Sequence, residues 1–117
     1  MARSETIYKI CPAAAWAEAA AKGEFAGHGD DLRDGFIHFS TAEQVEETAA
    51  RHFAGKSGLV VIAVAAGALG AALKWEPSRG GELFPHLYGV LDPSCISWCR
   101  PLPLDAAGRH IFPDLEP

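Results

Sequence analysis

Histidines stand among aromatic and polar residues in two short segments of the sequence, FIHFS, which ends at Ser40, and RGGELFPHLYG, which ends at Gly89. Because side chains alternate along a strand, His38 is expected to share a face with Ser40, and His86 with Tyr88. Imidazole, hydroxyl and phenol groups on such faces can donate and accept hydrogen bonds. We therefore predict that the two segments form opposite walls of a ligand-binding cleft.

The first segment has a functional and a structural interpretation. In the functional one, His38 lies at the floor of the cleft and donates a hydrogen bond to a ligand hydroxyl or amide, while Ser40 fixes the orientation of its ring. In the structural one, His38 is a core histidine whose ring nitrogens are satisfied by Ser40 or by backbone groups, since an unpaired buried imidazole is costly. The sequence leaves both interpretations open.

The second segment supplies four more candidate residues. Glu82 could act as a general base or steady a developing positive charge, and Arg79 could bind a phosphate or a carboxylate. His86 and Tyr88 could contact the ligand, the phenol by stacking or by a hydrogen bond. The alternatives are a surface ion pair between Arg79 and a nearby glutamate, and a simple turn into an edge strand on which His86 is solvated.

Several common kinds of site are not indicated by the sequence. Its five histidines show no HxxxH or HxH spacing and its three cysteines no CxxC pair, so neither a metal site nor a disulfide framework is predicted. The GxSxG frame of a nucleophile elbow is absent, as are the GxGxxG and GxxxxGK[ST] phosphate loops. The remaining candidates for a functional site are the polar residues that lie on predicted strands.

Length and charge narrow the class of protein. A chain of 117 residues that is 49% hydrophobic fits one domain with one ordinary core. Its net charge of −5 argues against binding bulk nucleic acid or an anionic membrane. The longest apolar run, residues 59–73, is short and interrupted by glycines, and the N-terminus lacks the apolar core of a signal peptide. We expect a cytoplasmic monomer or weak homodimer.

Hydrophobic patterns predict the elements that position the two segments. Residues 6–11 form a first strand, with Tyr8 on one face and Lys9 on the other. Residues 59–65 are continuously apolar, which implies a central strand covered on both faces. Helices are predicted at residues 12–22 and, after a capping-box pattern at residues 40–43, through about residue 53.

The remaining chain is predicted to hold a loop and shorter strands. Residues 27–35 have the glycine and aspartate content of a long loop that could lie over a site. The sum is a single α+β domain over residues 1–113, with about six mostly antiparallel strands and two main helices. Residues 114–117 are expected to be a disordered tail.

An ordered set of motifs resembles a known family. The motifs are Tyr8-Lys9-Ile10, DGFIHFST with Gln44, Trp75-Glu76 and FPHLYG. Together they resemble the small bacterial proteins called domain of unknown function 952. The resemblance implies the ADP-ribosyltransferase-like fold, a split sheet with a cleft for NAD, and within it the RNA 2'-phosphotransferase branch.

The resemblance also implies places for individual residues. His38 and Ser40 would lie on a cleft strand, while Tyr8 and Lys9 would lie on the first strand, where such transferases often carry His or Arg. Lys9 could contact a phosphate. NAD would then be a substrate of the protein and not a permanently bound cofactor.

Three hypotheses follow for function. The first is an enzyme that binds or processes NAD, ADP-ribose or a related phosphate-bearing nucleotide, with His38 and Glu82 as its catalytic residues. The second is a non-catalytic module that binds a small molecule in the same cleft. The third is a structural or interaction domain in which the polar residues satisfy one another.

Overall fold

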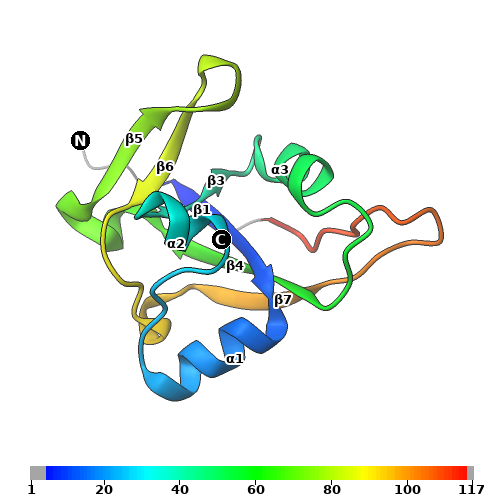
Figure 1. Cartoon of the computed structure of the whole chain (residues 1–117), viewed down its shortest axis with the longest axis horizontal. Coiled ribbons are helices and arrows are strands. Elements are labelled where there is room, and N and C mark those ends of the chain that lie inside the picture. The colour runs from blue at the N-terminus through cyan, green and yellow to red at the C-terminus, as the bar shows by residue number, and fades with distance from the viewer. Residues whose placement is uncertain (1–4, 116–117) are drawn as a thin grey trace.

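The computed structural model describes residues 5–115 and places them in an α+β fold. The strands are β1 (Thr6–Pro12), β2 (Ile37–His38), β3 (Ser40–Thr41), β4 (Leu59–Ala65), β5 (Leu73–Pro77), β6 (Leu83–Leu87) and β7 (Trp98–Leu102). The α-helices are α1 (Ala13–Lys22), α2 (Asp30–Asp34) and α3 (Val45–His52), and the 3₁₀ segments are η1 (Ala66–Ala72), η2 (Arg79–Gly81) and η3 (Pro93–Cys95). Figure 1 shows the arrangement of these elements.

The strands form two antiparallel sheets. The larger sheet has the order β3-β1-β4-β7, and the smaller has the order β2-β6-β5. The predicted strand at residues 36–40 is therefore not one strand, because it breaks at Phe39 into β2 and β3, which belong to different sheets. At the break the backbone N–H of Phe39 donates to the carbonyl of Pro85 in β6, 3.0 Å away.

Two apolar cores lie on the two faces of the β1–β4 pair. Ile7 and Cys11 of β1 pack in the first core, whereas Tyr8 and Ile10 pack in the second. This alternation confirms the predicted faces of β1 and places Lys9 on the side of the first core. The prediction that β4 is covered on both faces is also confirmed, since its residues alternate between the two cores.

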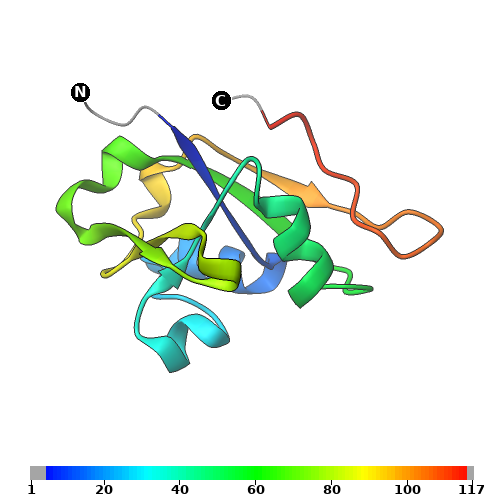
Figure 2. The ribbon, with the colours of Figure 1, turned by 90° about the horizontal axis from the view of Figure 1, so that it is seen from above.

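Different elements cover the two faces. Helix α1, through Trp16 and Ala19, and the smaller sheet cover the first core, while α3, through Val45 and Ala49, covers the second. Figures 1 and 2 show α1 and α3 at separate positions around the β1–β4 pair, with α2 beside the smaller sheet. The first core therefore lies between the larger sheet on one side and α1 and the smaller sheet on the other.

Helix α3 begins later than the capping-box pattern predicts. Its first residue is Val45, and its N-cap Gln44 makes no side-chain cap. The Gln44 amide oxygen accepts from the backbone N–H of Thr41, 3.0 Å away, and the Ser40 hydroxyl lies 2.9 Å from that of Thr48. The polar groups at the start of the helix thus fasten β3 to α3 instead of capping the helix.

The C-terminal part returns along the second core. A turn around Asp105 and Gly108 leads to a single bridge between Leu104 and His110. This hairpin projects from the body of the molecule in Figures 1 and 2. Leu115, which we expected in a disordered tail, packs against the second core and accepts a hydrogen bond from the Tyr8 hydroxyl. Residues 116–117 of the expected tail lie outside the described residues.

No helix within residues 5–115 is long and apolar enough to span a membrane.

Candidate functional site

A cavity of about 460 Å³ opens between β1, α2, α3 and the smaller sheet. One part of its wall is apolar and includes Ile10, Phe39, Phe53 and Phe84. The other part carries charged and imidazole groups, namely Lys9, His28, Asp30, Asp31, Arg33, Asp34, His38, His52, Lys56 and His86. A wall of this mixed character can hold a ligand that has an apolar and a charged end.

Asp31 is the centre of the polar part. Its side chain is 1% exposed, and its Oδ2 lies 2.6 Å from the Nζ of Lys9, whose side chain is 7% exposed. Its Oδ1 lies 2.6 Å from the Nδ1 of His38 and accepts from the backbone N–H of that residue at 3.0 Å. The backbone N–H of His28 donates to Oδ2 at 3.1 Å. These contacts explain why α2 forms where the composition predicts only a loop.

The environment of Asp31 favours its charged form. Burial alone would raise the pKa of Asp31, but the hydrogen bonds from His38 and the charge of Lys9 outweigh burial and lower the pKa from 3.8 to about 2. A carboxylate at this position compensates the buried ammonium group of Lys9. The other two N–H donors of Lys9 have no partner within residues 5–115, and Lys9 lines the cavity.

His38 is held between two carboxylates. Its Nε2 lies 3.0 Å from the Oδ2 of Asp34, on the side of the ring opposite Asp31. The pKa of Asp34 is lowered, mainly by its hydrogen bond with Arg33 and to a lesser extent by the neighbouring His38. Both ring nitrogens can donate to these two acceptors only when the imidazole carries two protons. The His38 ring is therefore fixed in position by carboxylates on two sides.

His86 is held in a different way. Its Nδ1 lies 2.9 Å from the Oε1 of Glu76 in β5, and the Tyr88 hydroxyl donates to the same oxygen at 2.7 Å. These two hydrogen bonds, first the one from His86, lower the pKa of Glu76, and the pKa of Tyr88 is raised by its bond to the carboxylate. Phe36 stacks on the His86 ring with a centroid distance of 4.2 Å. The ring of His86 is therefore fixed by a carboxylate and by an aromatic neighbour.

The two histidines lie opposite each other in the smaller sheet. His38 of β2 pairs with His86 of β6, and their ring centroids are 5.4 Å apart. Both residues line the cavity together with Lys9. Two imidazoles and an ammonium group around one space are suited to bind an anion and to move protons to and from it.

The structure brings three of the predicted site residues together and places others elsewhere. Lys9, His38 and His86 share the cavity. Tyr8 points to the other face of β1, into the second core, because neighbouring strand residues face opposite ways. Ser40 does not orient His38, since the break at Phe39 puts it in the other sheet, where it bonds with Thr48.

Glu82 and Tyr88 do not line the cavity. Glu82 is exposed and accepts a hydrogen bond from the Gln44 amide at 3.3 Å. Tyr88 is 40% exposed and reaches the site only through Glu76. The backbone of Arg79 belongs to η2, but its side chain lies outside the part of the chain that is described.

Sequence reasoning missed the carboxylates that hold both histidines. Asp31 and Asp34 lie in the segment predicted as a loop, seven and four residues before His38. The signal available was a cluster of aspartates just before a histidine flanked by aromatic residues. Glu76 stands next to Trp75 in one of the quoted motifs, and only the pairing of β5 with β6 brings it to His86.

Within residues 5–115, no group of three or more histidine, cysteine, aspartate or glutamate side chains is arranged to hold a metal ion.

Comparisons with known proteins agree on the family and the architecture. The family model described as "Protein of unknown function (DUF952)" matches residues 10–99. The chain is similar to the crystal structure of protein CC0527 from Caulobacter crescentus, with 51% identity and a TM-score of 0.87 over 91% of this chain and 93% of that one. It is also similar to the solution NMR structure of CC0527, with 52% identity and a TM-score of 0.81 over 89% and 90% of the two chains. None of the curated proteins matches the sequence.

Proposed function

Because the chain belongs to the family of unknown function DUF952, its activity must be inferred from its own site, and we propose that the cavity binds a small phosphate-bearing compound of nucleotide size. The observation that carries this proposal is the position of Lys9. A lysine side chain that is 7% exposed and lines a cavity of about 460 Å³ keeps two N–H donors without partners among the described residues 5–115. Such donors match the oxygens of a phosphate group.

The rest of the cavity supports the same class of ligand. Arg33 and Lys56 add two cations at its wall, and His38 adds a ring that both neighbouring carboxylates hold in a donating state. The aromatic side chains of Phe39, Phe53 and Phe84 supply an apolar wall for a base or another planar group. The cavity volume falls within the range of about 300 to 1,000 Å³ that is typical of small-molecule sites.

The proposed class of small phosphate-bearing ligands includes NAD and ADP-ribose. The ADP-ribosyltransferase-like fold, which the family resemblance implies, would provide a cleft for them, while the residues of the cavity support only the phosphate and the planar group. In this proposal the protein takes NAD as a substrate or ligand, and Glu82, which is exposed beside Gln44, has no part in binding.

Thermal unfolding in the presence of single compounds tests the proposal. The compounds are inorganic phosphate, AMP, ADP-ribose and NAD. A compound at one hundred times its dissociation constant is expected to stabilise the folded protein by about 2.7 kcal/mol. If none of the four raises the unfolding temperature, the proposal is wrong.

Two arginine variants localise the binding. Arg33 lines the cavity and its side chain is 69% exposed, so Arg33→Gln removes a cation with little effect on folding. Arg51 lies on α3 outside the cavity lining, and Arg51→Gln is the matched control. We expect weaker binding in Arg33→Gln and unchanged binding in Arg51→Gln. Equal binding in both variants would place the ligand elsewhere.

A structural role is the second candidate. Asp31 bonds to both Lys9 and His38 and so fastens α2 to β1 and β2. In a purely structural network, the same contacts would stabilise the fold and no ligand would be needed. The panel of compounds separates the two candidates directly, because a structural network predicts no thermal shift with any of them.

A further inference from the structure

We propose that the cavity hydrolyses a phosphodiester bond, with His86 as the general base and His38 as the general acid. This inference rests on the proposed function, since it requires the phosphate to bind beside Lys9. It goes further by naming the bond that is broken and the route of each proton. Glu76 is a positioning residue in this scheme.

His86 has the hydrogen bonds of a general base. Its side chain is 5% exposed, its Nδ1 donates to the Glu76 carboxylate, and its Nε2 makes no hydrogen bond within residues 5–115. A carboxylate that accepts from Nδ1–H selects the tautomer in which Nε2 carries a lone pair. Since His86 lines the cavity, this nitrogen can take a proton from a water molecule there.

Three neighbours keep the His86 ring in place. The Glu76 oxygen that accepts from His86 also accepts from the Tyr88 hydroxyl, at 2.9 and 2.7 Å respectively. Phe36 stacks on the His86 ring and also contacts the rings of His38 and Tyr88, with centroid distances of 4.6 and 5.1 Å. A ring held at one edge and across one face cannot turn away from the cavity easily, which is the preorganisation that proton transfer requires.

His38 has the hydrogen bonds of a general acid. Its Nδ1–H is held by the buried Asp31, and its Nε2–H points to Asp34, whose side chain is 31% exposed. The solvent-accessible carboxylate of Asp34 can give way to a ligand oxygen, while Asp31 keeps the ring oriented. His38 then donates the Nε2 proton to the leaving oxygen.

The reaction consumes one water molecule and is balanced in protons. His86 Nε2 takes a proton from water as the water oxygen forms a bond to phosphorus. The bond from phosphorus to the leaving oxygen breaks, and that oxygen receives the proton of His38 Nε2. The products are an alcohol and a phosphate monoester, and exchange of protons with solvent returns the two histidines to their starting states.

Charge favours a diester over a monoester as the substrate. Three cationic side chains line the cavity, Lys9, Arg33 and Lys56, and three carboxylates line it as well, Asp30, Asp31 and Asp34. A diester carries one negative charge at neutral pH, whereas a monoester carries nearly two, and the second charge repels the hydroxide-like oxygen that forms as His86 deprotonates the water. Lys9 stabilises the charge that develops on the phosphoryl oxygens during attack.

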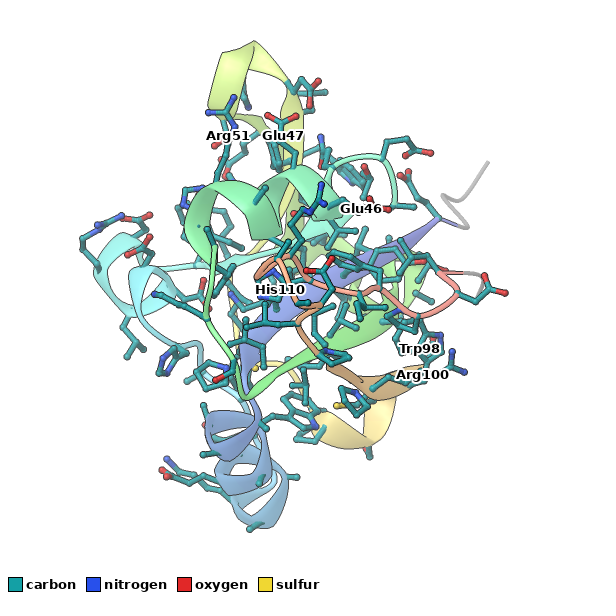
Figure 3. The ribbon with its side chains drawn as sticks, turned by 90° about the vertical axis from the view of Figure 1, so that its right-hand side faces the viewer. Glu46, Glu47, Arg51, Trp98, Arg100 and His110 are labelled. Atoms are coloured by element: carbon teal, nitrogen blue, oxygen red, sulfur yellow. The ribbon has the colours of Figure 1, made fainter. Side chains whose placement is uncertain are left out.

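Hydrolysis of bis(4-nitrophenyl) phosphate, followed by release of 4-nitrophenolate, tests the inference. The wild type is expected to turn this diester over faster than 4-nitrophenyl phosphate. Loss of the general base in His86→Gln is expected to reduce kcat by about 100-fold or more. Glu76→Gln should lower kcat with little change in KM, because it misorients the base without touching the substrate. Glu46→Gln, on the exposed side of α3 in Figure 3, is the matched control and should be unchanged.

The outcomes separate this inference from the proposed function. If the compounds of the binding panel stabilise the protein but the diester is not hydrolysed, or if folded His86→Gln keeps wild-type turnover, the hydrolytic inference is overturned and the binding proposal stands. If no compound binds, both are wrong. Because His86→Gln could fail to fold, a second measurement uses the wild type: histidine side-chain ¹H–¹⁵N spectra are expected to show His86 with its proton on Nδ1. A proton on Nε2 would overturn the assignment of the base.

Discussion

The two faces of the β1–β4 pair differ in the chemistry that they bury. On the second face, Tyr8, Val61 and Leu102 pack with α3 in an apolar core. On the first face, the apolar core adjoins a network in which the buried Asp31 bonds to both Lys9 and His38. The difference shows that one strand, through the alternation of its side chains, can contribute to an apolar core on one face and to a charged network on the other. Both faces of β1 reach the cavity, through Ile10 and Lys9.

The largest expected effect comes from removing the charge at the centre of the network. Asp31→Asn leaves the buried ammonium group of Lys9 without a counter-charge and is expected to lower the free energy of unfolding by about 3–5 kcal/mol in urea titrations. The control Asp30→Asn changes a side chain that is 65% exposed and should cost less than about 0.5 kcal/mol. Equal losses in the two variants would mean that the network contributes nothing to stability.

Lowering the pH should reduce the contribution of the charged network to the free energy of unfolding before it affects the apolar core. The pKa of Asp31 is about 2 in the folded protein, whereas an ordinary aspartate has a pKa of 3.8. The ionised carboxylate therefore stabilises the folded state fully above about pH 4, and this stabilisation is lost as the pH falls toward 2. A shift of this size corresponds to about 2 kcal/mol. Unfolding free energies measured between pH 5 and pH 2 should show this loss in the wild type and not in Asp31→Asn. A parallel pH dependence in both proteins contradicts the assignment.

A smaller effect is expected on the apolar face. The Nε1 of Trp98 is buried and has no hydrogen-bond partner within residues 5–115. The Arg100 guanidinium lies 4.5 Å from the centre of the Trp98 ring, and Figure 3 labels the two residues next to each other. Trp98→Phe removes the unsatisfied donor and some packing area, and these changes oppose each other. We expect a change within about 1 kcal/mol by thermal unfolding. A loss above about 3 kcal/mol would show that the indole N–H has a partner.

The smallest effect is expected on the outer surface of α3. Glu47 and Arg51 form an ion pair of 2.7 Å across one helical turn, and both side chains are more than half exposed. Figure 3 shows the two side chains together on the helix. Glu47→Gln should cost less than about 0.5 kcal/mol, and the difference should shrink further in high salt. A salt-independent loss of several kcal/mol would remove the distinction between this surface pair and the buried network.

Local patterns predicted the strands better than the site. The alternation in β1 and the apolar run of β4 depend only on neighbouring residues, and both were confirmed, including the face of Lys9. The break at Phe39 could not be predicted, because it depends on a hydrogen bond to Pro85 in a strand far along the chain. The roles of Asp31 and Glu76 were missed for the same reason, since each meets its histidine only after α2 docks or β5 pairs with β6.

The break at Phe39 also determines where the chain tolerates a change in length. This one residue joins two strands that belong to different sheets, so it sets the register of both. An insertion here would shift one strand by a residue and turn either His38 away from Asp31 or Ser40 away from Thr48. The hairpin between Leu104 and His110 projects from the body and carries no such constraint. Relatives with insertions or deletions are therefore expected to differ at that hairpin and to keep a single residue between the two short strands.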